Sequence, residues 1–149
     1  MSSNTCLCID LRSAAQKLTQ RYDEAMVPSG ISVTQFSQLH LIRSLDGPTL
    51  KALSAASDLD RSTLGRNIRV MEKLGLVRMK VGADARTRSI HLTRKGANAY
   101  KRAIPLWHSV QSQLLSRLGD RSQLDELLAT LSAPLTEPLT TDDETGKSL

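Results

Sequence analysis

Aromatic residues are scarce in this 149-residue chain, at 3% of the sequence, and long apolar runs are missing. The scarcity argues against a protein that stacks single-stranded bases on aromatic side chains. No stretch approaches the ~20 consecutive apolar residues that a membrane-spanning helix requires. The N-terminus MSSNTCLCIDLRS also lacks the basic start and apolar run of a signal peptide. We therefore expect a cytoplasmic protein with no membrane partner.

The motifs of several enzyme classes are absent as well. The sequence has no glycine-rich phosphate loop, no nucleophile elbow and no His-Glu metal-binding motif. Two cysteines in a reducing compartment do not make a disulfide framework, and Cys6 and Cys8 lack the CxxC spacing of thiol oxidoreductases. We expect a protein that is not an enzyme and that has no cofactor.

Positive charge is concentrated in one third of the chain. The whole sequence carries a formal charge of +5, but residues 58–95 hold ten Lys and Arg against four Asp and Glu, so this segment carries +6 and the remainder −1. A generally sticky basic protein would spread its charge, whereas a local patch is typical of a DNA-binding surface.

The segment 60–77, DRSTLGRNIRVMEKLGLV, predicts a helix suited to a groove of DNA. Asp60 can cap its first turn, and Gly75 ends it. One face is an apolar stripe of Leu64, Ile68, Met71 and Leu74. The opposite face can donate to phosphates and purine edges, and it carries Arg61, Ser62, Thr63, Arg66, Asn67 and Arg69. The alternative is an ordinary solvated helix face.

The segments around this helix give it a context. Residues 49–57 predict a short helix, and the connection at 58–60 makes the pair a helix-turn-helix. Upstream, residues 9–26 predict a first helix, and a second begins near Thr34, whose hydroxyl can cap it. A turn at residues 46–48 ends the second helix.

Two alternating runs, residues 76–81 and 88–92, predict a strand, a tip and a returning strand. The ribbon carries Arg78, Lys80, Arg86 and Arg88. A basic ribbon directly after a DNA-reading helix is typical of a wing whose arginines enter the minor groove. The alternative is a solvated hairpin whose charges protect a sheet edge.

The C-terminal part predicts two more helices. Thr93 can cap a very long one, which Pro105 should bend, and Gly119 and Asp120 separate it from a last helix. The apolar faces of these helices are larger than a small winged DNA-binding region can cover, so we expect a homodimer. Its two DNA-binding helices would lie about 34 Å apart. We expect residues 1–30 and 93–131 to form the helical dimerisation region, residues 31–92 the DNA-binding region, and residues 132–149 a disordered tail.

This order of elements resembles the multiple antibiotic resistance regulator (MarR) family of bacterial transcription factors. The similarity covers roughly residues 8–131 and rests on DRSTLGRNIRVMEKLGLV, the D-x-R of Asp84 and Arg86, and IHLTRKG at 90–96. It implies a mainly α fold with a small β-wing, and a dimeric winged helix-turn-helix repressor of a pseudo-palindromic operator. By resemblance, Arg86 lies in the minor groove and Asp84 orients it or its neighbours. Gly65 departs from the family, in which many members carry a DNA-contacting side chain there.

The signal that such a regulator senses is open at this point. The position of Cys8 is similar to that of the reactive cysteine in the organic hydroperoxide resistance regulators, although only Tyr22 matches the tyrosines of that branch. The amides of a helix N-terminus stabilise a thiolate, which suits a redox switch in which Cys6 or a cysteine of a second copy resolves an oxidised Cys8. As alternatives, both cysteines are plain packing residues, or they belong to a metal site, which two thiolates alone leave incomplete.

Small-molecule sensing is the rival mechanism. The family often binds aromatic compounds between its dimerisation and DNA-binding regions, and the candidates to line such a pocket are Tyr22, Met26, Phe36, His40 and Trp107. Side chains at this helical spacing are more often core. A further alternative is an architectural dimer that binds DNA without sequence preference.

Overall fold

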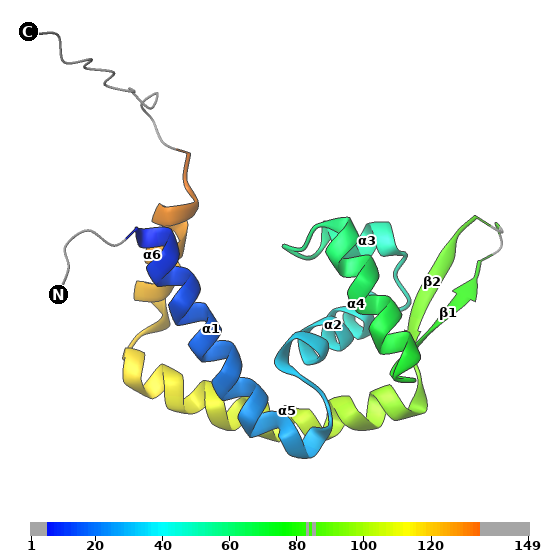
Figure 1. The fold of residues 1–149 in the computed structure, drawn as a ribbon, viewed down its shortest axis with the longest axis horizontal. Coiled ribbons are helices and arrows are strands. Elements are labelled where there is room, and N and C mark those ends of the chain that lie inside the picture. Colours follow the sequence, from blue (N-terminus) through cyan, green and yellow to red (C-terminus); the bar gives the residue numbers. More distant parts are fainter. Residues whose placement is uncertain (1–5, 83, 85, 135–149) are drawn as a thin grey trace, which may run out of the picture. The chain divides into compact units, whose positions relative to one another are not determined.

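The computed structural model describes residues 6–82, 84 and 86–134. Helices dominate it, with a small two-stranded antiparallel sheet, as the sequence predicts (Figure 1). The elements are α1 (Leu7–Met26), η1 (Val27–Ser29), α2 (Val33–Ser44), α3 (Leu50–Ala55), α4 (Arg61–Lys73), β1 (Val77–Val81), β2 (Arg88–Leu92), α5 (Arg94–Leu118) and α6 (Arg121–Ser132). The chain divides into two compact units, Met1–Gln113 and Leu114–Leu149.

Two helix starts differ from the sequence prediction. The N-cap of α2 is Ser32 and not Thr34, because Ser32 and Gln35 form a reciprocal capping box. The Ser32 hydroxyl accepts from the Gln35 amide at 3.2 Å, and the Gln35 side chain accepts from the Ser32 amide at 3.0 Å. Similarly, α1 begins at Leu7, with Cys6 as its N-cap, so Cys8 lies inside the first turn.

The core of the first unit holds the helix-turn-helix and the base of the wing together. Leu53 of α3, the three residues Leu64, Ile68 and Met71 of α4, and Ile90 of β2 are all at most 1% exposed. Leu74 is a correction to the predicted apolar stripe: it is 46% exposed because α4 ends at Lys73 and Leu74 is its C-cap. The buried face of α4 therefore spans three residues, and the opposite face is free for a partner.

The two strands pair in a register that runs from Val77↔Leu92 to Val81↔Arg88. Their alternation buries Val77 and Ile90 and leaves Arg78, Lys80 and Arg88 in solvent. The amide of Ile90 donates to the carbonyl of Pro48 at 2.9 Å, which attaches the base of the wing to the segment before α3. The wing is thus fixed at its base relative to the helix-turn-helix.

The end of α4 packs closely against the starts of β1 and α5. Gly75 has a φ of +71°, which ends α4 in a left-handed turn. As predicted, Thr93 caps α5: its hydroxyl accepts from the Gly96 amide at 3.0 Å and donates to the Gly75 carbonyl at 2.5 Å. Gly96 lies so close to the chain that an added Cβ would be 1.9 Å from the Leu76 carbonyl oxygen. Only a residue without a side chain fits there.

The second unit holds the end of α5 and α6. Gly119 has a φ of +78°, and Asp120 accepts from the Ser122 amide at 3.0 Å, so both act as the sequence predicts. No residue of α6 is buried, and its Leu127, Leu128 and Leu131 are 42–49% exposed. Ser132, where the predicted tail begins, still belongs to α6, and residues 135–149 lie outside the described part of the chain.

None of the described helices is both long enough and apolar enough to cross a membrane.

Gly96→Ala should lower the free energy of unfolding by about 1–3 kcal/mol, because its methyl group would overlap the Leu76 carbonyl. Gly65→Ala is the matched control, since a Cβ there would meet nothing closer than Leu50 Cδ2 at 3.7 Å, an ordinary contact. Removing a glycine from the interior of α4 should stabilise by up to about 1 kcal/mol. Urea unfolding followed by circular dichroism measures both, and equal effects of the two variants would contradict the close approach at Gly96.

Candidate nucleic-acid interface

Asp60 organises the first turn of α4. Its carboxylate accepts from the Thr63 amide at 2.9 Å, from the Ser62 hydroxyl at 2.6 Å and from the Thr63 hydroxyl at 2.5 Å. These bonds, the Ser62 hydroxyl first, hold the pKa of Asp60 well below its usual range. Because both hydroxyl protons are donated to the carboxylate, the Ser62 and Thr63 oxygens can only accept further hydrogen bonds. The Thr63 oxygen accepts one from Arg66 at 3.3 Å.

The outer face of α4 carries the long basic side chains. Arg61, Arg66 and Arg69 are exposed, on the side opposite the buried stripe. Asn67 is only half-buried and lies at the flank of this face, where it lines a small cavity shared with α2. The six predicted residues of this helix therefore divide into three exposed arginines, two hydroxyls bound to Asp60, and one amide at the edge.

The wing tip is closed by backbone hydrogen bonds. Gly82 donates to the Thr87 carbonyl at 2.7 Å, and Thr87 donates to the Asp84 carbonyl at 2.9 Å. The Asp84 side chain accepts from the backbone amide of Arg86 at 3.0 Å, so it constrains the main chain that carries Arg86 and leaves the guanidinium exposed. Arg88, at the start of β2, is also exposed.

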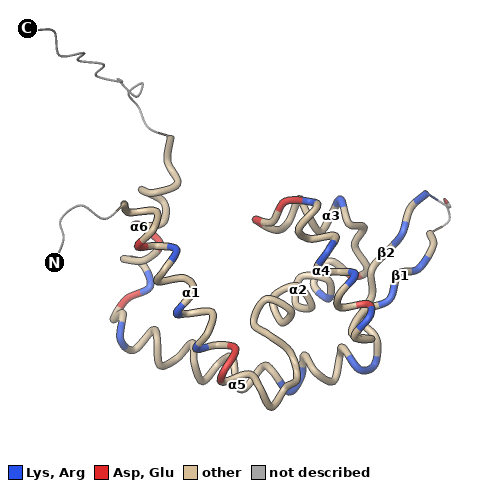
Figure 2. Tube along the Cα trace, in the orientation of Figure 1, with Lys and Arg blue, Asp and Glu red and all other residues tan. Residues whose placement is uncertain are grey.

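A groove of about 440 Å³ lies between the helix-turn-helix and the wing. Its apolar lining consists of Leu50, Met79 and Ile90, and its basic lining consists of Lys51, Arg61, Arg86 and Arg88. Figure 2 shows Lys and Arg along both strands and along α4. Among residues 6–82, 84 and 86–134 the sole ion pair joins Arg121 to Asp125 in α6, so the basic groups of the groove have no carboxylate partner there. They are available to phosphates.

Lys51 of this groove is absent from the sequence prediction. It lies in the first turn of α3, and in the sequence only its place at the start of a helix-turn-helix could have singled it out. Two more residues that line the groove are Thr49, the N-cap of α3, and Leu50. The sequence prediction placed both in the short helix but not in the interface.

The predicted ligand-binding aromatics pack against one another. Phe36 stacks on Tyr100 with ring centroids 5.1 Å apart and contacts Trp107 at 5.8 Å, and His40 Nδ1 lies 2.7 Å from the Tyr100 hydroxyl. Tyr22 donates to the side chain of Gln111. Met26 is fully buried. This arrangement is typical of a core.

Cys6 and Cys8 are both exposed free thiols at the start of α1, with one residue between them. The side chain of Cys6 makes no capping hydrogen bond. Among the described residues, no three His, Cys, Asp or Glu side chains come together as a metal site.

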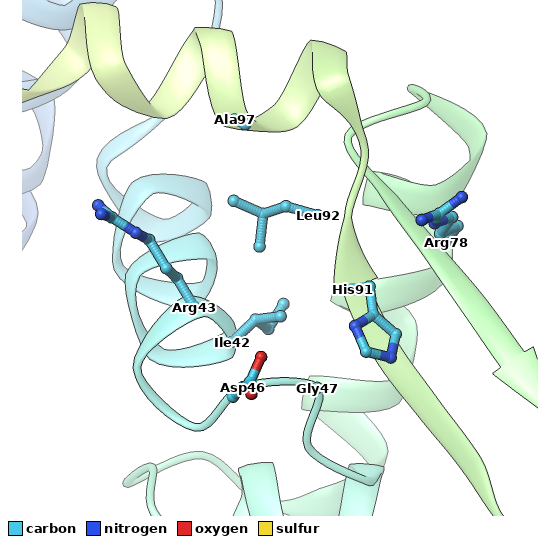
Figure 3. Close-up of a pocket in the computed structure, with 8 residues that line it drawn as sticks. All are labelled: Ile42, Arg43, Asp46, Gly47, Arg78, His91, Leu92 and Ala97. Atoms are coloured by element: carbon cyan, nitrogen blue, oxygen red, sulfur yellow. The ribbon is translucent and has the colours of Figure 1, made fainter. Parts of the chain in front are cut away.

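A cavity of about 290 Å³ opens on another side of the first unit, and it contains two arginines, one histidine and one acid (Figure 3). The Asp46 carboxylate points into it, whereas the Arg43 guanidinium is turned away and lies 5.4 Å from the centre of the Tyr100 ring. His91 packs against Gly47, where an added Cβ would be 2.3 Å from the ring. These side chains do not converge on a common ligand position.

Known proteins are similar to this chain over most of its length. The model of the MarR family matches residues 29–87. The transcriptional regulator HosA of Escherichia coli is 31% identical over 76% of this chain and 83% of HosA. The structure of the M. tuberculosis transcriptional regulator MosR in complex with DNA is 44% identical with a TM-score of 0.76, over 85% of this chain and 93% of MosR. A mutant E. coli MarR with operator DNA, 22% identical, has a TM-score of 0.75 over 85% of this chain and 94% of that protein, a likeness of fold.

Asp60→Ala should lower the melting temperature by a few degrees at neutral pH, because it removes the cap of α4. The carboxyl has a lowered pKa in the folded state, so its contribution is fully present above the ordinary value of 3.8 and disappears as the pH falls through the folded value. The difference in melting temperature between wild type and variant should therefore shrink in acid.

The matched control is Asp58→Ala, because this nearby carboxylate makes no hydrogen bond within the described residues. Thermal unfolding by circular dichroism at neutral and acidic pH measures all three proteins. A loss in Asp58→Ala as large as that in Asp60→Ala would contradict a specific capping role.

Proposed function

The chain belongs to the MarR family, whose members are transcriptional regulators and not enzymes, and on this premise we propose that it is a homodimeric repressor of a pseudo-palindromic operator. The observation that carries the proposal is the basic groove between α3, α4 and the wing, in which Lys51, Arg61, Arg86 and Arg88 have no acidic partner in the part of the chain that the structure describes. Double-stranded DNA is the polyanion whose grooves admit a helix and a ribbon side by side.

We place α4 in the major groove and the wing in the minor groove. Arg61, Arg66 and Arg69 are long enough to reach phosphates and guanine edges from the exposed face of α4. Arg86 is the side chain for the minor groove, since Asp84 restrains its backbone while its guanidinium is exposed. The hydroxyls of Ser62 and Thr63 contribute mainly through Asp60, which they hold in place.

A second copy of the chain would cover apolar surface that the first unit and the second unit each leave in solvent. In α1, Leu7, Ile9 and Leu18 are 41–70% exposed. In α6, Leu127, Leu128 and Leu131 are 42–49% exposed. Residues 1–30 and 93–131 are therefore proposed as the dimerisation region, which would place two copies of α4 one turn of B-DNA apart, about 34 Å.

Arg86→Ala should weaken operator binding by about 1–3 kcal/mol, or about 5- to 150-fold, and lower the salt dependence by about one ion. Fluorescence anisotropy with the DNA upstream of the gene, at two salt concentrations, measures both. Lys147→Ala removes the same charge at a position outside both the proposed DNA-binding and dimerisation regions and should bind as the wild type does. Unchanged affinity in Arg86→Ala would remove the wing from the interface, and equal affinity for unrelated competitor DNA would favour an architectural protein over a repressor.

The release signal is proposed to be oxidation of the cysteine pair, because both thiols are exposed at the start of α1 while the candidate aromatic pocket is filled by its own rings. The Cys8 thiolate attacks the terminal oxygen of a hydroperoxide, which yields a sulfenic acid and an alcohol. The thiol of Cys6, or of a cysteine in the second copy, then attacks the Cys8 sulfur, forms a disulfide and releases water. The start of α1 belongs to the proposed dimer contact. Formation of the disulfide would therefore change the distance between the two DNA-binding regions.

Mild treatment with cumene hydroperoxide should lower the operator affinity of the wild type by about tenfold or more, and dithiothreitol should restore it. Cys8→Ser should keep its affinity throughout. In Cys6→Ser, a dimedone-reactive sulfenic acid should accumulate if Cys6 is the resolving residue. Equal loss of binding in the wild type and in Cys8→Ser would exclude this sensor and would direct the search to aromatic effectors.

A further inference from the structure

Of the three exposed arginines on the outer face of α4, one is held by another side chain. A guanidinium nitrogen of Arg66 donates to the hydroxyl oxygen of Thr63 at 3.3 Å. Arg61 and Arg69 make no such bond within the part of the chain that the structure describes. Arg66 therefore differs from its neighbours in having a preferred direction before any partner binds.

The direction of this hydrogen bond depends on Asp60. The Thr63 hydroxyl donates its only proton to the Asp60 carboxylate at 2.5 Å, so its oxygen is left as an acceptor for Arg66. The carboxylate is fixed in turn, because it accepts from the Thr63 amide at 2.9 Å and from the Ser62 hydroxyl at 2.6 Å. The three side chains of Asp60, Thr63 and Arg66 thus form a hydrogen-bond series that is anchored to the main chain of α4.

A fixed guanidinium is better suited to a base than to a phosphate. Guanine presents its O6 and N7 acceptors side by side in the major groove, and an arginine reads both with two parallel N–H groups. This contact requires one orientation of the guanidinium, and a free arginine loses rotamer freedom when it adopts that orientation. Arg66 donates one N–H to Thr63 and keeps enough of the others for the paired contact.

We propose that Asp60 and Thr63 are positioning residues, which hold Arg66 in the orientation that reads a guanine in each half of the operator. The inference rests on the proposed function, since it requires α4 to lie in the major groove. Asp60 then has two roles, as the N-cap that stabilises α4 and as the acceptor that sets the polarity of the series. The unrestrained Arg61 and Arg69 contact phosphates, which accept hydrogen bonds from many directions.

Two variants separate the positioning role from the capping role. Asparagine is as good an N-cap as aspartate, so Asp60→Asn keeps the acceptor for the Thr63 amide. Its second polar atom is an NH₂ group, which cannot accept the Thr63 hydroxyl proton, and the polarity of the series is lost. Thr63→Val keeps the branched shape of the side chain and removes the hydroxyl that Arg66 contacts.

The experiment begins with selection from a random-sequence duplex library by the full-length wild type. Each half of the preferred site should contain a guanine whose replacement, as an A·T pair, lowers affinity about tenfold in fluorescence anisotropy at fixed salt. Replacement by 7-deazaguanine, which pairs normally but lacks the N7 acceptor, should also weaken binding. In Arg66→Ala neither replacement should change the affinity further, because the side chain that reads the guanine is absent.

The positioning variants should lose preference for guanine while they remain folded. In Asp60→Asn and in Thr63→Val, the ratio of affinities for the G·C and A·T sites should fall by about threefold or more. Asp60→Asn also loses a negative charge, so its affinity for unrelated duplex DNA should equal or exceed that of the wild type. An unstable helix would lower both affinities, and thermal unfolding by circular dichroism checks the fold of each variant.

Asp58→Asn is the matched control, since it removes the same charge from a carboxylate that makes no hydrogen bond within the described residues. It should keep the wild-type preference for guanine. An equal loss of preference in Asp58→Asn would show a general effect of charge and overturn the inference.

Two other outcomes separate this inference from the proposed function. If Arg66→Ala loses the preference for guanine while Asp60→Asn and Thr63→Val retain it, the positioning role is overturned and sequence-specific binding by α4 stands. If the selection yields no preferred site, the proposed repressor function fails, and the inference fails with it.

Discussion

The contact between Gly96 and the carbonyl of Leu76 determines how α4, the wing and α5 meet. The backbones approach so closely there that an added Cβ would lie 1.9 Å from the oxygen, and the Thr93 hydroxyl connects the same turn to Gly75. Because α4 ends at this junction and β1 begins beside it, the angle between helix and wing is set by main-chain atoms. This main-chain junction and the buried side chain of Ile90 together position the wing beside α4, on either side of the groove that holds the basic residues.

Local signals allowed much of this fold to be predicted from the sequence. The strand Arg88–Leu92 and the caps at Asp60, Thr93 and Asp120 follow from residue types a few positions apart. The N-cap of α2 was predicted at the wrong residue because Ser32 and Thr34 are both good N-cap residues. The choice depends on the hydrogen bond between the Gln35 side chain and the Ser32 amide. Leu74 was wrongly predicted to be buried, because hydrophobic periodicity predicts the face on which a side chain lies but not where the helix ends.

The candidate site was predictable only in part, because its remaining features arise from contacts between distant segments. Lys51 faces the wing arginines across a groove that no local pattern describes. The small cavity that Asn67 lines is shared by residues of α2 and α4, and the stacking of Phe36 on Tyr100 joins α2 to α5. The assignments of Arg61, Arg66, Arg69, Arg86 and Arg88 to DNA remain predictions whose geometry the structure supports.

The cap of α4 has an electrostatic consequence of its own. Three hydrogen bonds keep Asp60 ionised at any physiological pH, so a permanent negative charge lies at the edge of a field of arginines. A polyanion that approaches this surface is attracted by most of it and repelled at one point. The repulsion disfavours every orientation that brings a phosphate next to Asp60. The capping residue therefore restricts the orientations in which DNA can dock on this surface.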